Sequence, residues 1–302
     1  LVVPGNHDIL NAMAIDYSKE ELYYTPYITK DDFIEIYEEA GYKDALSIDP
    51  NSLSYLFKAS EDLYFLMLDT NTYEKNNNFA PSSEGYLKEE TLAWAKENLK
   101  DLKDKTILAF MHHPVLDLAD MSDYVLKNSD EVLAFFEEYD ITLSFSGHIH
   151  IQNYKSQGAH TNFGVSSLSV YDHHYLDVTF NTKEIDIKSV NLNMENFSDD
   201  PFFENFDENA YDYFKEYSTT RMISSCLENE EDEDFAYYLK ELRGAANCLE
   251  FAGYGNKIKE LYENAEEYQR IKDSKNACAI ALRQRADFFK SEARNLKLSM
   301  IK

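Results

Sequence analysis

The amino-acid sequence predicts an α/β domain over residues 1–195, followed by an all-α helical bundle over residues 196–302. In the first part, short apolar runs rich in strand-forming residues alternate with amphipathic stretches of helical period, as in sheets covered by helices. In the second part, apolar residues recur only at helical spacing. Composition changes at the same place: all eight histidines lie between His7 and His174, whereas every arginine lies at or beyond Arg221.

Within the first part, each element is justified by a local signal. Thr29 is suited to cap a helix that ends near Gly41. A second helix is expected over residues 88–102, and a third is expected to begin at a Ser129 cap. Buried or half-buried strands are expected over the apolar runs at residues 54–58, 64–69, 106–111, 141–145, 163–170, 175–180 and 185–190.

The second part begins with an acidic stretch. Residues 196–212 contain Pro201 and are expected to form the linker between the domains. Beyond them, one apolar face runs from Phe235 to Leu249 and another from Leu282 to Leu296, which predicts two helices. Gly253 and Gly255 are expected to separate helical segments. The acidic run over residues 228–234 is interpreted as a solvated helix start, with calcium binding as an alternative.

Charge and composition exclude several classes of protein. Against 29 Lys+Arg stand 56 Asp+Glu, a formal net charge of −27, so a nucleic-acid duplex or an anionic membrane would be repelled. No apolar run is long enough for a membrane span. The chain opens without Met on the strand-like Leu1-Val2-Val3-Pro4, so a targeting segment would lie upstream. The three cysteines form no CxxC pair and are expected to be buried thiols.

Three polar clusters follow strand-like runs directly, which is where open α/β sheets gather their sites. They are Gly5-Asn6-His7-Asp8, His112-His113-Pro114 and Gly147-His148-Ile149-His150. Imidazole and amide ligands without thiolates suit Mn, Fe or Zn in a hydrolytic site. Taken singly, a histidine at a strand end is more often structural. Taken together and in this order, the clusters predict a metal centre.

GNHD, HxP and GHxH resemble three of the five motifs of the calcineurin-like metallophosphoesterases, over roughly residues 1–190. The resemblance is closest to bacterial class III 3′,5′-cyclic nucleotide phosphodiesterases with a C-terminal helical domain, because of three further segments. These are residues 147–152, residues 68–71 and residues 52–55. The family's fold is a β-sandwich flanked by helices, so this architecture is expected for residues 1–195.

The resemblance also implies residue roles. Two divalent metal ions, Mn, Fe or Zn, would lie about 3.5–4 Å apart and activate water for attack on phosphorus. Asn6, His112 and His148 would bind one metal, and His150 would bind the other. His7 would lie beside the scissile phosphate as a catalytic acid or charge stabiliser, and Asp8 would orient its ring.

One departure from the family pattern is large. The family's D-x-H and G-D motifs precede GNHD, so this chain is expected to be N-terminally truncated, and residues 1–302 alone are expected to be inactive. A circular permutation is an alternative, because Asp172-His173-His174 matches D-x-H, but no G-D follows.

Other polar and aromatic residues have two interpretations each. His113 is expected beside the ligands rather than among them. The pair His173 and His174 either borders the site or lies at a sheet edge, and His160 is expected in an exposed loop. The tyrosines that follow GNHD either stack on a nucleobase or pack against the sheet; they are Tyr17, Tyr23, Tyr24 and Tyr27. Because residues 1–194 contain no arginine, Arg221 and Arg243 are the candidates for a phosphate clamp.

The leading hypothesis is therefore metal-dependent hydrolysis of a small phosphodiester, with 3′,5′-cyclic nucleotides expected as substrates. Another small phosphoester, such as a glycerophosphodiester, is the nearest alternative. A non-catalytic scaffold with the same fold is an alternative of another class. Localisation is left open: the resemblance suggests an exported or lipid-anchored protein, and a cytoplasmic one is also compatible. The oligomeric state is not predicted.

Overall fold

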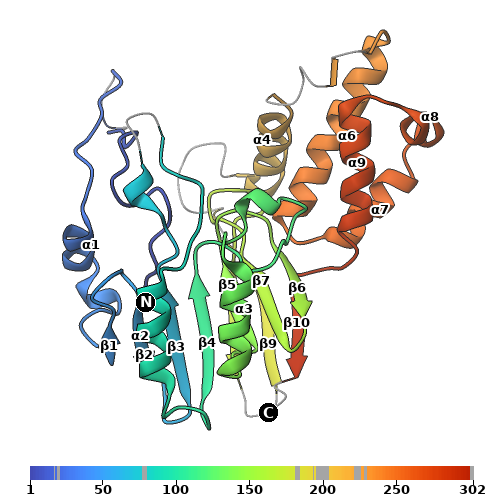
Figure 1. Ribbon diagram of the computed structural model, residues 1–302. Coiled ribbons are helices and arrows are strands. Elements are labelled where there is room, and N and C mark those ends of the chain that lie inside the picture. Colours follow the sequence, from blue (N-terminus) through green and yellow to red (C-terminus); the bar gives the residue numbers. More distant parts are fainter. Residues whose placement is uncertain are drawn as a thin grey trace. The chain divides into compact units, whose positions relative to one another are not determined.

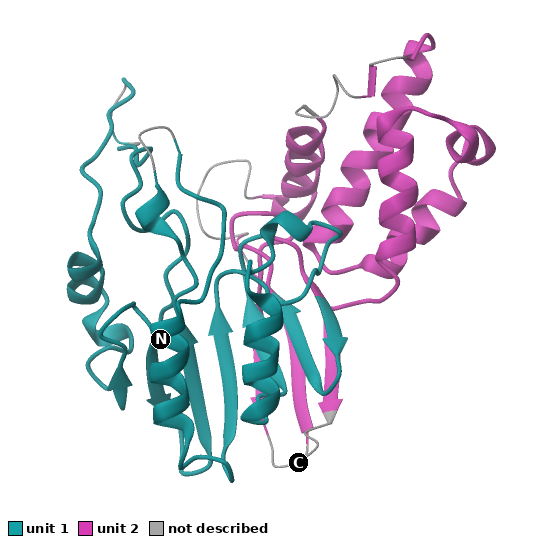
Figure 2. Cartoon of the chain, in the orientation of Figure 1, with its two compact units in different colours: residues 1–149, 154–164, 302 teal, residues 150–153, 165–301 magenta. Residues whose placement is uncertain are grey.

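The computed structural model describes all residues except 17, 19–20, 77–79, 181–183, 193, 195–203, 221–225, 228–229 and 300–302. The chain divides into two compact units, shown in different colours in Figure 2. Unit 1 comprises residues 1–149 and 154–164, and unit 2 comprises residues 150–153 and 165–301. None of the described helices combines the length and the apolar character needed to cross a membrane.

Unit 1 is built on a seven-stranded sheet in the order β1-β2-β3-β4-β5-β7-β6 (Figure 1). Strands β3, β4, β5 and β7 pair in parallel, and β1 and β2 extend the sheet in antiparallel pairing. The strands are β1 (Ser47–Ile48), β2 (Tyr55–Lys58), β3 (Leu63–Leu68), β4 (Thr106–Met111), β5 (Leu143–Ser146), β6 (Asn153–Gln157) and β7 (His160–Gly164). The parallel strands place their carboxyl ends along one edge.

Both faces of this sheet are apolar, because alternate residues of a strand point to opposite sides. On one face, Leu66 and Leu68 pack with helices α2 (Glu89–Leu99) and α3 (Ser129–Glu138). Figure 1 shows these two helices on the same side of the sheet. On the other face, Met67 packs in a cluster with Phe33 of helix α1 (Lys30–Ile36). Short 3₁₀ helices lie at Glu38–Ala40, Tyr73–Lys75 and Ser122–Tyr124.

Helix caps test two of the predictions. Thr29 is the N-cap of α1 and forms a capping box with Asp32, as predicted, although the α-helix ends at Ile36 rather than near Gly41. The prediction of a Ser129 cap is wrong, because the N-cap of α3 is Asn128. The Asn128 amide instead accepts from the Leu87 N–H and donates to the Leu87 carbonyl, which ties α3 to the start of α2.

Unit 2 combines a small sheet with helices. Strand β9 (Glu184–Asn191) pairs antiparallel with β8 (His174–Phe180) on one side and with β10 (Asn295–Ser299) on the other. The helices are α4 (Phe206–Thr220), α6 (Glu233–Phe251), α7 (Gly255–Glu263), α8 (Tyr268–Asp273) and α9 (Ala277–Phe288). Gly253 lies between α6 and α7, as predicted, whereas Gly255 is the first residue of α7. The N-cap of α6 is Asp232, so a helix starts at the acidic run, as predicted.

Two predictions about the second half differ from the structure. The helix expected to reach Leu296 ends at Phe288, and residues 295–299 form β10 because their alternating side chains complete a sheet with β9. The predicted linker lies partly outside the described residues, and from Phe206 onward it is α4. Strands β8 and β9 pair with each other, and β10 pairs with β9 in the same compact unit; the domain boundary near residue 195 stays a prediction.

The cysteine prediction is wrong for two of the three residues. Cys226 and Cys278 form a disulfide across 52 residues of sequence, which joins a short helical segment to α9. Cys248 is a free, buried thiol in α6, as expected. A sequence-distant pair carries no local spacing signal, because pairing is decided by the fold.

Candidate metal centre

The parallel strands bring two of the predicted clusters together. Met111, the last residue of β4, pairs with Leu68 of β3 and with Ser146 of β5. The next residues along the three strands, Asp69, His112 and Gly147, therefore lie at the same edge of the sheet. The Gly147 N–H donates to the His112 carbonyl at 3.0 Å, which continues the ladder by one step. This is the carboxyl edge at which open α/β sheets place ligands.

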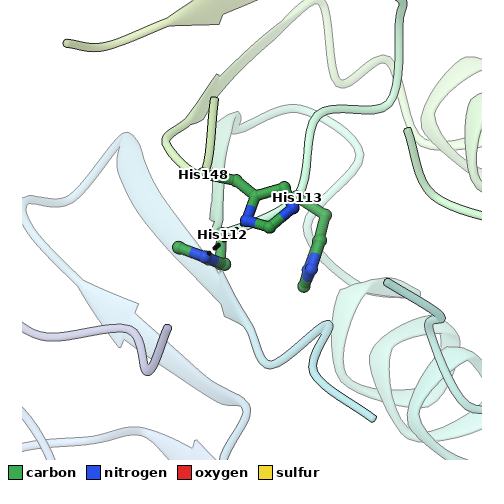
Figure 3. A group of neighbouring side chains, drawn as sticks. All are labelled: His112, His113 and His148. Atoms are coloured by element: carbon green, nitrogen blue, oxygen red, sulfur yellow. Dashed lines mark hydrogen bonds between the residues drawn. The ribbon is translucent and has the colours of Figure 1, made fainter. Parts of the chain in front are cut away.

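Asn6 joins these histidines from the N-terminal segment. Its Oδ1 lies 2.9 Å from His112 Nε2, and His148 Nδ1 lies 3.1 Å from the same nitrogen. Figure 3 shows the contact between the His112 and His148 rings, with His113 beside them. The structure thus brings together Asn6, His112 and His148, three of the four predicted metal ligands.

The spacing of these three atoms fits a divalent cation. Two ligand atoms that are each about 2.1 Å from an ion, with a right angle between them, lie about 3.0 Å apart. His112 Nε2 carries at most one proton, so it cannot donate to Asn6 and also accept from His148. A shared cation removes that conflict, because all three atoms then offer a lone pair. The donor set is the one expected for Mn, Fe or Zn.

A chain of hydrogen bonds orients Asn6. Its Nδ2 donates to the Ser82 carbonyl at 3.0 Å, which leaves Oδ1 to face His112. Asn71 Nδ2 donates to the Pro4 carbonyl at 2.7 Å and fixes the backbone two residues earlier. Asn71 is held in turn by the buried Asp69 carboxylate. Such partners fix the orientation of a metal ligand before the metal arrives.

A second clamp acts on the same segment. The Tyr55 hydroxyl donates to the Val2 carbonyl at 2.8 Å and accepts from the Val2 N–H at 3.0 Å. Gly41 lies against that hydroxyl so closely that a Cβ there would be 2.5 Å from it. Burial raises the pKa of Tyr55, so the hydroxyl keeps its proton for this contact.

His113 is completely buried beside the cluster. Its Nδ1 lies 2.9 Å from Thr70 Oγ1, and its ring centroid is 4.3 Å from that of His148. Burial, with the neighbouring His148 as a second cause, lowers the pKa of His113 to about 3, so the ring is neutral. His112, His113 and His148 each offer a ring nitrogen within 4.8 Å of the others. A role for His113 beside the ligands stays a prediction.

Gly85 makes room for the His113 ring. A Cβ at Gly85 would lie 2.3 Å from His113 Cγ, which no packing adjustment of a rigid ring can absorb cheaply. The Gly85 carbonyl also accepts from the Lys127 N–H, so the loop is fixed on its other side. A glycine is therefore required there for His113 to lie beside His148.

The predicted catalytic pair lies in the turn after Asn6. His7 and Asp8 are both exposed, and Asp8 Oδ2 accepts a 2.6 Å hydrogen bond from the Gly5 N–H, which closes the turn. The Asn11 side chain donates to the His7 carbonyl. The catalytic role of His7 and the orienting role of Asp8 stay predictions.

The GHxH segment has an unusual backbone. His148 and His150 both adopt left-handed conformations, with φ of 68° and 56°. Non-glycine residues rarely do so without a functional or packing reason. The segment is also divided between the units, since Ile149 belongs to unit 1 and His150 to unit 2. The structure therefore describes His150 apart from the Asn6, His112 and His148 cluster.

The other described histidines, His160, His173 and His174, make contacts of their own. His160 lies in β7 and is buried, not exposed as predicted; its Nδ1 donates to the Ile141 carbonyl at 2.7 Å. His174 is buried in unit 2, where it pairs with Asp172. His173 packs against Phe206 and is part-buried.

The remaining candidates are placed as follows. Tyr23, Tyr24 and Tyr27 are each more than half exposed, and Tyr17 lies outside the described residues. Arg243 is buried in α6 and donates to Glu250 at 3.0 Å, so its guanidinium is committed to an ion pair within the helices. Arg221 lies outside the described residues.

Sequence reasoning missed the residues that orient the ligands: Ser82, Asn71, Tyr55 and Gly85. The only signal for two of them was the resemblance at residues 52–55 and 68–71, which was noted without a role. Their function depends on contacts between positions distant in the sequence, such as Tyr55 with Val2 and Asn6 with Ser82, which are 53 and 76 residues apart.

Comparison with known families agrees with this geometry. The model of the calcineurin-like phosphoesterase family matches residues 1–152, half of the chain, and includes all three clusters. The chain belongs to the calcineurin-like phosphoesterase family. Members of this family are hydrolases that use a dinuclear metal centre.

Particular relatives resemble parts of the chain. It is 35% identical over 78 residues to the glycerophosphodiester phosphodiesterase GpdQ of Enterobacter lignolyticus, a match that covers 25% of this chain and 28% of that protein. The structure of a dimetal phosphatase from Danio rerio is similar with a TM-score of 0.46 and 13% identity, over 55% of this chain and 66% of that one. PhoD is similar with a TM-score of 0.37 and 13% identity, over 50% and 40%.

Proposed function

We propose that this protein hydrolyses small phosphodiesters with a pair of divalent metal ions, and that 3′,5′-cyclic nucleotides are its substrates. The convergence of Asn6 Oδ1, His112 Nε2 and His148 Nδ1 carries this proposal. Membership of the phosphoesterase family supports the reaction class. The resemblance at residues 52–55, 68–71 and 147–152 supports the substrate class.

Each predicted residue has a task in this reaction. Asn6, His112 and His148 hold one ion, and His150 contributes to the other. The metal pair, when bound, supplies Lewis acidity and an activated water. As water attacks phosphorus, the P–O bond to the ribose breaks, and His7 gives its proton to the leaving alkoxide. Asp8 keeps the turn that carries His7 closed, through its bond to Gly5.

The charge of the protein favours a small substrate. A net charge of −27 and the lack of arginine before Arg221 disfavour a nucleic-acid backbone as the substrate. The substrate phosphate must be met by the metals, by His7 and by lysines. A compact diester with a single negative charge suits such a site.

A glycerophosphodiester is the second candidate. It is favoured by the 35% identity to a glycerophosphodiester phosphodiesterase, which covers about a quarter of each chain. The same ligands and the same acid would serve it, because the motifs specify metal binding and phosphorus chemistry but not the alcohol. The non-catalytic scaffold is the third reading, and it predicts metal-independent binding without turnover.

The test is a substrate panel on the full-length protein with Mn²⁺. We expect turnover of cyclic AMP or cyclic GMP, with 2′,3′-cyclic nucleotides, glycerophosphodiesters and aryl diesters as comparisons. His148→Ala should reduce kcat/KM by about 100-fold or more, since even the loss of a residue that only orients a ligand costs 10–100-fold. Preference for a glycerophosphodiester would select the second candidate, and the absence of any turnover would contradict the proposal.

Residues 1–302 taken alone carry three of the five family motifs. We propose that this polypeptide binds one ion through Asn6, His112 and His148 and does not turn over substrate. Isothermal titration with Mn²⁺ should give one weak site. Metal-dependent turnover by purified 1–302 would show that the D-x-H and G-D motifs are dispensable.

A further inference from the structure

Within unit 2, the side chain of Gln152 anchors the segment of residues 150–153. Gln152 is buried, two residues after His150. Its Nε2 donates to the Ser189 hydroxyl at 2.6 Å and to the Ala293 carbonyl at 2.7 Å. Ala293 is 141 residues away in sequence, so a distant part of the chain sets the position of residue 152.

The other side of the Gln152 amide faces His174. Because the Ala293 carbonyl only accepts, the amide nitrogen must lie there, and Oε1 is left to contact His174 Nε2. His174 Nδ1 lies 2.7 Å from Asp172 Oδ1. The ring therefore lies between Asp172 Oδ1 and Gln152 Oε1 and helps to orient Gln152.

Arg294 completes this network. Its guanidinium donates to Asp172 Oδ2 at 2.8 Å and to the Ala252 carbonyl at 2.8 Å. Burial alone would raise the pKa of Asp172, but the hydrogen bond from His174 and the charge of Arg294 lower it, so the carboxylate stays ionised. The network is buried, charged on both sides and fully paired, which makes it rigid.

Gly253 packs against the Gln152 side chain. Its φ is +78°, and a Cβ there would lie 3.0 Å from Gln152 Nε2 and 3.2 Å from Cγ. The Gly253 carbonyl accepts from the Ala293 N–H. The loop between α6 and α7 therefore contacts the same residue before β10 that Gln152 contacts. The Gln152 side chain therefore has one position available to it.

His150 needs such support. Its left-handed backbone is an unfavourable conformation that only surrounding contacts can maintain. The Ser166 hydroxyl donates to its carbonyl at 3.0 Å, and Gln152 fixes the chain two residues later. Both contacts lie within unit 2 and restrain the chain at and just after His150.

We propose that Gln152, held by His174, Asp172 and Arg294, is a positioning residue that fixes the backbone of His150 for metal binding. The inference rests on the proposed function, which makes His150 a metal ligand. It assigns the Asp172-His174 pair and Arg294 a task that the sequence did not suggest. Integrity of unit 2 then decides the affinity of the metal held by His150.

The experiment titrates metal-free full-length protein with Co²⁺ and reads both sites by visible absorption. Gly253→Ala should displace the Gln152 side chain by steric contact. Arg294→Lys should weaken the hydrogen bonding that holds Asp172. Each variant should weaken the ion held by His150 by about tenfold, the usual effect of a residue that orients a ligand. The ion held by Asn6, His112 and His148 should bind as in the wild type.

Matched controls separate positioning from general damage. Gly158→Ala places a Cβ at a similar φ of +60° with nothing within 4 Å. Arg283→Lys changes a part-buried arginine that donates to the Ser274 carbonyl, away from the network. Both controls should bind two ions normally. If Arg294→Lys does not fold, Ser189→Ala removes one contact of Gln152 more gently and should give a smaller weakening of the same ion.

The outcomes distinguish the two proposals. If His150→Ala loses one ion while Gly253→Ala, Arg294→Lys and Ser189→Ala keep normal affinity for both, the positioning role is overturned and the ligand role stands. If His150→Ala itself binds both ions normally, the ligand assignment of the proposed function is overturned. Equal weakening by Gly158→Ala would also contradict the inference.

Discussion

The polar cluster of unit 1 and the polar network of unit 2 are both buried or half-buried, yet they are built on opposite plans. In unit 1, Asn6 Oδ1 and His148 Nδ1 each lie within hydrogen-bonding distance of the same atom, His112 Nε2. In unit 2, Asp172 contacts His174 through one carboxylate oxygen and the guanidinium of Arg294 through the other, so its negative charge faces an opposite one. The ligand atoms of unit 1 all offer lone pairs, so a bound cation would stabilise them. The network of unit 2 pairs donors with acceptors and needs no added ion.

The comparison can be tested first through the disulfide. Among the described residues, only unit 2 contains one. Replacing both Cys226 and Cys278 with Ser should cost unit 2 about 4 kcal/mol of unfolding free energy, the chain-entropy value for a loop of 52 residues. Urea denaturation followed by hydrogen exchange of peptides from α6 and β4 would assign the loss. Reductant should lower the wild type to the level of the double variant and leave the variant unchanged.

Metal binding, in contrast, should stabilise unit 1. Mn²⁺ at 100 times its Kd should stabilise unit 1 by about 2.7 kcal/mol, because it binds only the folded cluster. Exchange protection should rise in β4 and β5 peptides. His148→Ala should abolish the gain. Protection that survives this substitution would show that the cation binds elsewhere.

Packing around the cluster should matter next. Gly85→Ala drives a Cβ into the His113 ring and should cost about 1–3 kcal/mol. Gly147→Ala is the matched control, because its Cβ would meet only His112 Nδ1 at 3.8 Å, an ordinary contact. Thermal unfolding of the two variants should separate them clearly. Equal melting temperatures would mean that His113 can move away.

The smallest effect is a dependence on pH in unit 1. Burial lowers the pKa of His160 below its ordinary value, despite its hydrogen bond to the Ile141 carbonyl. Below about pH 6.5 the unfolded chain binds a proton at His160 that the folded chain does not bind. The free energy of unfolding therefore decreases as the pH is lowered, by at most about 1.4 kcal/mol per pH unit. His160→Gln should flatten this slope in urea denaturations at pH 5 and pH 7. An unchanged slope would assign the effect to another group.

The sequence predicted most of the first sheet. The run at residues 106–111 matches β4 at both ends, because it is a buried strand whose apolar residues are consecutive in the chain. Of the helix caps, Thr29 was predicted but Asn128 was not. The Asn128 side-chain oxygen accepts from the Leu87 N–H, not from an N–H of its own helix. His160 was expected in a loop, because a single histidine between polar residues carries no sign of burial.

The site was predictable in its ligands and not in its supports. Asn6, His112 and His148 stand in short motifs, so their types and order were readable along the chain. Their supports, including Ser82 and Asn71, act through contacts between distant residues that leave no local pattern. The same holds for Gln152, whose partner Ala293 is 141 residues away.

Strand β10 sets the order in which the protein can be completed during synthesis. Asn295 pairs with Lys188, and more than a hundred residues of helices and loops separate the two. While a ribosome is still making α6 to α9, β9 therefore exposes an unpaired edge, and Arg294 has not yet reached Asp172. Closing a contact of such length is slow, so a nascent chain would spend seconds in a form that chaperones or proteases could recognise, with the His150 segment not yet secured.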